Sequence, residues 1–180
     1  PGADTSADEP ALALEPDREE ARPAPLTAGD VIRALQFPDS AEDTEGVRAL
    51  HRALEDHELA RLIRAAQDVL TLLSQEGVYM DDLEPDAIQA SAWRLFAAGS
   101  RGEAIAAVGA IRDRAPLGIA AARMREDAIF RDAAHHFLRA FDRSFQNFEK
   151  AASDAEIADL AQTRTARAFM LCGRVAGVFD

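Results

Sequence analysis

Residues 127–149, DAIFRDAAHHFLRAFDRSFQNFE, contain the most regular pattern in the chain. Large apolar side chains recur there at steps of three and four residues, which places them on one side of an α-helix over several turns. These side chains are Phe130, Ala134, Phe137, Phe141, Phe145 and Phe148. Such a stripe is typical of the central helix of a bundle, and we favour this interpretation over a ligand cavity lined by the rings.

The segments before this helix also show helical periodicity. Thr27, with Asp30 three residues later, is a capping-box pattern that predicts a short helix, and this helix should end at Phe37. Over residues 45–76 the apolar positions change phase near Asp56. This shift favours two helices with Asp56 as the second N-cap, although one helix that contacts two different neighbours remains the alternative.

Four further helices are predicted from proline, glycine and capping-box signals. We expect them to begin at Pro85 (ending at Ala98), at Ser100 with Glu103, at Pro116, and at Ser153 with Glu156 (running towards Gly177). No alternation typical of a β-strand extends beyond four residues, so the sequence predicts an all-α fold. The prediction is an irregular helical bundle of about six or seven helices that forms a single domain over residues 26–180, a length that suits one core.

Residues 1–25 differ from the rest of the chain in composition. They hold seven acidic residues, are rich in proline and contain almost no large apolar side chains. A segment of this kind cannot bury enough surface to offset its ordering entropy, so we expect a disordered acidic leader. It serves either to solubilise the chain or as an arm that docks on a basic face, in this chain or in another.

Composition excludes several classes of protein. The net charge is −12, but residues 1–45 contribute −9 and residues 94–180 contribute +2, so wholesale nucleic-acid binding is disfavoured while a local basic face remains open. No apolar run is long enough to span a membrane and no secretory signal is present, which favours the cytoplasm. Cys172 is the only cysteine, and Lys150 is the only lysine against nineteen arginines, a skew typical of a GC-rich bacterium.

No residue pattern indicates catalysis or a bound metal, so we predict neither a cofactor nor a metal centre. His135 and His136 fall on opposite flanks of the phenylalanine stripe, where neighbouring residues are polar, and not in the bundle interior that a helical metal site requires. His51 and His57 lie among acidic residues but lack a third ligand from another segment. The familiar phosphate-binding, hydrolase, zinc and calcium motifs are absent.

The C-terminal segment, TRTARAFMLCGRVAGVF (residues 163–179), is apolar around most of its helical circumference. Arg164 falls near the middle of its apolar face, and Arg167 and Arg174 lie on one flank. A buried guanidinium must find a partner. We expect an internal ion pair for Arg164 first, then a carboxylate of a protein partner, then an anionic ligand, and simple exposure last.

These patterns favour a non-enzymatic protein-protein interaction or regulatory protein of a bacterial cytoplasm, which associates with a partner or with itself through the C-terminal helix. The alternative is a protein that binds a small molecule or anion through Arg164, Arg167 and Arg174.

Overall fold

The computed structural model describes residues 25–180 of the chain, and in this range every regular element is a helix. In chain order the elements are α1 (Ala28–Gln36), α2 (Thr44–Leu54), α3 (His57–Gln75), η1 (Met80–Asp82), α4 (Ala90–Ala97), η2 (Gly102–Val108), α5 (Arg114–Glu126), α6 (Ala128–Glu149), α7 (Asp154–Ala161) and α8 (Arg164–Val175). The predicted all-α class is confirmed. The leader predicted over residues 1–25 lies outside the described residues, apart from its last residue.

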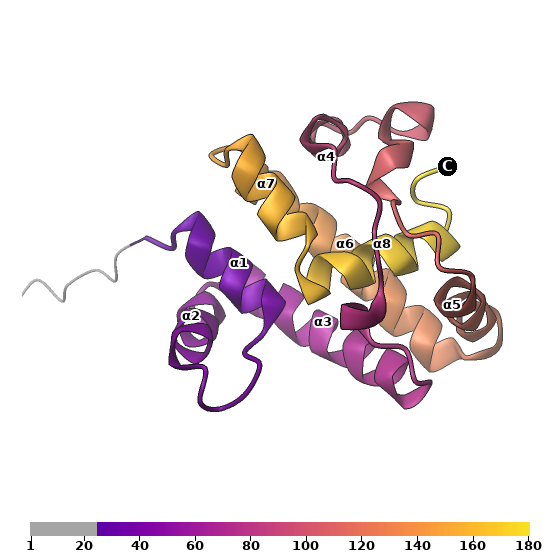
Figure 1. Ribbon diagram of the computed structural model, residues 1–180, viewed down its shortest axis with the longest axis horizontal. Coiled ribbons are helices and arrows are strands. Elements are labelled where there is room, and N and C mark those ends of the chain that lie inside the picture. Colours follow the sequence, from indigo (N-terminus) through magenta and orange to yellow (C-terminus); the bar gives the residue numbers. More distant parts are fainter. Residues whose placement is uncertain (1–24) are drawn as a thin grey trace, which may run out of the picture.

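The long helices α3 and α6 lie side by side and form the body of the molecule (Figure 1). The pair α1 and α2 covers one end, α5 lies at the other, and α4 with η2 forms a separate group on the side away from α3 (Figure 1). None of the helices in residues 25–180 is both long enough and apolar enough to cross a membrane.

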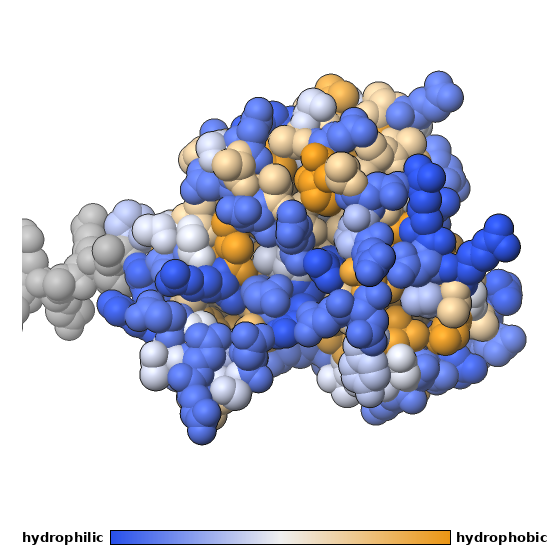
Figure 2. Space-filling view, viewed as in Figure 1, coloured by the Kyte–Doolittle hydropathy of each residue, from blue (hydrophilic) through white to orange (hydrophobic). Residues whose placement is uncertain are grey.

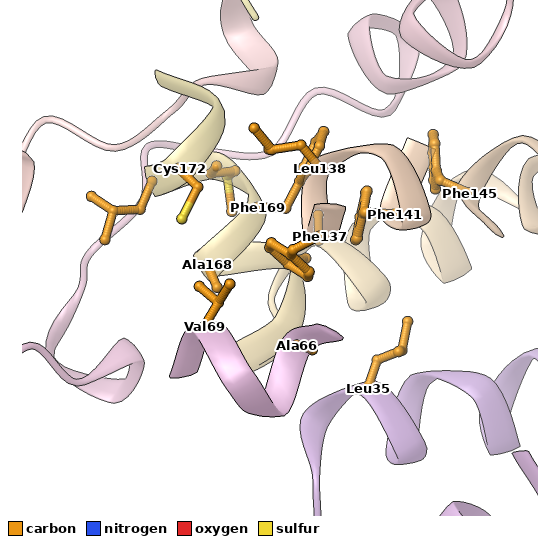
Figure 3. Packing of buried hydrophobic residues seen from close by; sticks show 14 of the residues in the cluster. Leu35, Ala66, Val69, Phe137, Leu138, Phe141, Phe145, Ala168, Phe169 and Cys172 are labelled. Carbon is orange, nitrogen blue, oxygen red and sulfur yellow. The ribbon is translucent and has the colours of Figure 1, made fainter. Parts of the chain in front are cut away.

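Aromatic rings of α4, α6 and α8 form the centre of the core. Phe141 of α6 stacks on Phe169 of α8 with the ring centroids 3.9 Å apart, and Trp93 of α4 packs against both rings. Figure 3 shows Phe137 and Phe141 of α6 meeting Phe169 of α8, with Ala168 of α8 and Val69 of α3 below them. Burial of the α6 stripe confirms its prediction as core, except that Phe148 is only partly buried.

Helix α8 occupies the middle of the bundle and packs against α1, α3, α5, α6 and α7. Its residues Thr165, Ala166 and 168–173 are all buried within the chain. The apolar circumference of this segment is therefore covered by intramolecular packing.

Several predicted helix boundaries are confirmed by the capping contacts. The side chain of Thr27 accepts a hydrogen bond from the Asp30 backbone N–H, and the side chain of Asp30 accepts one from the Thr27 backbone N–H. The chain breaks into two helices at Asp56, whose Oδ1 accepts from Leu59 N at 2.9 Å. A second capping box joins Ser153 and Glu156 at the start of α7.

Three boundaries were predicted wrongly. Residues 83–89 are irregular and the helix predicted from Pro85 begins only at Ala90. The predicted Ser100–Glu103 capping box does not form, because Gly102 has a φ of +81° and a tight 3₁₀ turn follows. The last helix is split, because the Thr163 side chain caps a new helix by accepting from Ala166 N at 3.1 Å. This split helps raise the described total to eight α-helices and two 3₁₀ helices, above the six or seven expected.

The ring of Phe179 lies between two glycines and closes the core. A Cβ atom on Gly109 would come within 2.7 Å of this ring, and one on Gly173 within 2.6 Å. Phe179 also packs against Phe96 and Phe169. Glycine at these two positions therefore provides the space that the ring occupies.

Candidate functional site

The three arginines predicted as binding residues project from α8 towards other segments of the same chain. Arg164 forms a double contact with Asp81, from Nε to Oδ1 and from Nη2 to Oδ2, each at 2.9 Å, and Nη2 also donates to Asp39 Oδ1 at 2.8 Å. These hydrogen bonds raise the pKa of Arg164, and the same contact from Arg164 lowers the pKa of Asp81. An internal ion pair, the first of the four alternatives for Arg164, is therefore present.

Arg167 and Arg174 donate to backbone carbonyl groups. Arg167 Nη1 donates to Met80 O and Leu83 O, which fixes η1 on α8. Arg174 Nη1 donates to the carbonyl oxygens of residues 109 and 111, which fixes the segment before α5. These contacts explain why an otherwise apolar helix contains arginines, while an anion-binding or partner-binding role for the three residues stays a prediction.

A cavity of about 420 Å³ lies elsewhere, between the start of α1, the start of α3, the end of α6 and the start of α7. The same elements border one another at the end of the molecule where α1 begins (Figure 1). The lining residues are Leu26, Ala28, Val31, Asp56, Glu58, Leu59, Ser144, Asn147, Phe148, Ala151, Ala152 and Glu156. They include three carboxylates and no lysine, arginine or histidine.

The floor of the cavity is apolar apart from one hydroxyl group. Val31, Leu59 and Phe148 line it, and the same residues also border a second, much smaller space of about 10 Å³ inside the core. Ser144 of α6 lines both spaces, is 7% exposed, and its Oγ has no hydrogen-bond partner among the described residues. A buried hydroxyl without a partner is costly, so this atom marks a position where a ligand atom can be bound with advantage.

The three carboxylates around the cavity are held in place by one hydrogen bond each. Asp56 caps α3, Glu58 Oε1 accepts from Asn147 Nδ2 at 2.9 Å, and Glu156 Oε1 accepts from Ser153 N at 2.9 Å. In each case the second carboxylate oxygen accepts no hydrogen bond from residues 25–180. The cavity thus combines an apolar floor, a free hydroxyl and a fixed negative rim.

This site could not be predicted from the sequence, because its lining comes from segments more than one hundred residues apart. The residue patterns mark Asp56 and Glu156 as members of helix caps, but nothing in them indicates that both caps border one cavity. Ser144 lies in the α6 sequence as an ordinary small residue, and only the folded structure shows that its hydroxyl group lacks a partner.

Among the described residues no group of three histidine, cysteine, aspartate or glutamate side chains is placed to hold a metal ion. Comparison of the chain with protein-family models, with curated proteins and with solved structures finds no match. The arguments about function therefore depend on the geometry of the sites.

Proposed function

We propose that this chain is a non-enzymatic binding protein whose cavity takes a small molecule with an apolar body and a positively charged amine. One observation carries the proposal: the unpartnered Ser144 hydroxyl group lies on an apolar floor beneath three oriented carboxylates. A ligand with both characters can bury its apolar part and donate N–H hydrogen bonds to the Ser144 hydroxyl group and to the free carboxylate oxygens.

The size and charge of the cavity support this class of ligand. Small-molecule sites typically enclose about 300–1,000 Å³ and combine apolar walls with a few polar groups, a range that includes this cavity. Three carboxylates without a basic lining residue favour a cation and repel an anion. An ammonium group offers three donors, enough for the Ser144 hydroxyl group and two of the carboxylates that border the cavity.

The ligand proposed here is a cation, which differs from the second function predicted from the sequence. That alternative assigned a small molecule or anion to Arg164 and its neighbours, whereas Arg164 pairs with carboxylates of the chain, and Arg167 and Arg174 donate through Nη1 to backbone carbonyl groups. Self-association through the C-terminal helix is not part of the proposal, since the apolar residues of α8 are covered within the chain. On the face shown in Figure 2, hydrophobic side chains form small patches separated by hydrophilic ones, not one broad surface.

The test is a comparison of three ligands of matched shape: 2-phenylethylamine, 2-phenylethanol and phenylacetate, titrated into the protein by calorimetry. We expect the amine to bind more tightly than the alcohol and the carboxylate not to bind. Ser144→Ala and Glu58→Gln should each weaken amine binding by about five-fold or more, which corresponds to the loss of one hydrogen bond.

Glu55→Gln is the matched control, because Glu55 is an exposed carboxylate close to the site in sequence but does not line the cavity. This variant should bind the amine as the wild type does. Equal affinity for the amine and the alcohol, or equal affinity of Ser144→Ala and the wild type, would contradict the proposal. Melting temperatures of all variants establish that each one is folded.

A further inference from the structure

A second, shallower depression lies between α3 and α6 and has the opposite charge. It has a volume of about 100 Å³ and is lined by Glu58, Arg61, His136, Arg139, Ala140 and Arg143, a set that we call the basic groove. Arg61, Arg139 and Arg143 are exposed, and no carboxylate of residues 25–180 forms an ion pair with any of them. Other arginines, such as Arg52, Arg94 and Arg164, do have acidic partners.

The spacing along α6 concentrates the positive charge. His136, Arg139 and Arg143 follow one another at steps of three and four residues on one side of α6, and Arg61 lies across the groove on α3. Like charges one helical turn apart repel each other. Negative charges close to these arginines would stabilise the arrangement, and Glu58 is the single acidic residue that lines the groove. The chain as a whole has a net charge of −12.

We propose that the acidic residues 1–24 of this chain dock in the basic groove. They contain seven acids and two arginines, so their charge is complementary to that of the groove. Their point of attachment is also close. Leu26 lines the cavity described above, and that cavity shares Glu58 with the basic groove. From this point the segment can extend by up to about 3.3 Å per residue.

Because residues 1–24 are covalently attached to the rest of the chain, weak contacts are enough to hold them in the basic groove. An exposed ion pair contributes at most about 1 kcal/mol, so a separate acidic peptide would bind poorly. A short covalent connection, however, gives an effective concentration in the millimolar range, and several weak pairs then hold the segment in place. Docking should therefore depend strongly on salt.

The experiment uses the full chain with a spin label on Ala13→Cys and NMR detection of amide signals. Cys172 is fully buried, so the label goes to the new cysteine. At low salt we expect the label to broaden the amide signals of Arg61, Arg139 and Arg143 at least two-fold more than those of Arg48 and Arg114, exposed arginines on α2 and α5. About 1 M NaCl, where the Debye length is ~3 Å, should abolish the difference.

The double variant Arg139→Gln/Arg143→Gln should remove the broadening at Arg61, and the double variant Arg48→Gln/Arg114→Gln should retain it. Uniform broadening over the surface, or broadening that persists in the first double variant, would overturn the proposal. A third result would also overturn it: the label causes no selective broadening, but an added polyglutamate peptide shifts the groove signals. The groove would then bind an acidic segment of another molecule.

Discussion

Arg164 shows how exposure sets the energetic value of an ion pair. Its side chain is 24% exposed, but the partners Asp39 and Asp81 are 72% and 59% exposed. Solvent therefore screens the carboxylate side of the contact. The loss of about 3–5 kcal/mol that a buried pair would give is too high for this one.

We expect Arg164→Met to destabilise the fold by about 1–2 kcal/mol at neutral pH, because the substitution removes charged hydrogen bonds while retaining apolar contacts. The difference from the wild type should shrink as the pH falls below about 4. Arg164 lowers the pKa of Asp81, so the stabilisation is present above the unfolded pKa of the carboxyl group and is lost as the pH falls through the lower folded pKa. Urea unfolding at pH 7 and pH 3 measures both values.

Arg48→Met serves as the control for this experiment, since Arg48 is exposed on α2 and makes no ion pair with residues 25–180. Its free energy of unfolding should follow that of the wild type at both pH values. A loss for Arg164→Met that is equally large at pH 3 would show that packing, and not the ion pair, determines the effect.

Among the hydrogen bonds that join α8 to the end of α1, one is fully buried. Thr165 is fully buried, and its Oγ1 donates to Leu35 O at 2.5 Å, which satisfies a carbonyl group in the last turn of α1. Thr165→Val keeps the shape but leaves that carbonyl group without this donor, so we expect a loss of about 1–3 kcal/mol. Thr71→Val, at an exposed position of α3, should change the midpoint of urea unfolding very little. Equal midpoints for the two variants would mean that water replaces the missing donor.

The elements also show what the sequence could predict. Boundaries set by contacts within four residues, such as the caps at Thr27, Asp56 and Ser153, were predicted correctly because their geometry is local. The break at Thr163 was missed, since the sequence on both sides continues the apolar pattern and the second cap adds only one hydroxyl contact. Pro85 was misleading because the segment around it is held by distant groups: Asp86 N donates to Ala110 O, and Arg167 donates to Leu83 O.

The candidate sites depend still more on distant contacts. The position of His136 on a polar flank of α6 followed from helical phase alone, but the position of Arg61 across from it depends on how α3 packs on α6. The cavity above Ser144 requires four helix ends to meet. No pattern in the sequence specifies such a meeting, because it results from the packing of the whole bundle.

At the scale of the whole molecule, Cys172 reports on global opening. It is fully buried in α8, and burial raises the pKa of its thiol to about 12. Only the thiolate reacts with disulfide reagents, so the native protein should be unreactive at pH 8. We expect the labelling rate to follow the population of the open state and to rise steeply near the urea midpoint. Rapid labelling in the absence of urea would show that α8 opens locally.

The position of the Phe179 ring between two glycines has an evolutionary consequence. Gly109 and Gly173 are acceptable in their segments because a ring fills the space that a side chain would otherwise take. A related protein with a small residue in place of Phe179 would be released from that requirement and would gain stability by exchanging the helical glycine for alanine. The three positions should therefore vary together among descendants of a common ancestor, with aromatic and glycine residues kept or lost as a set.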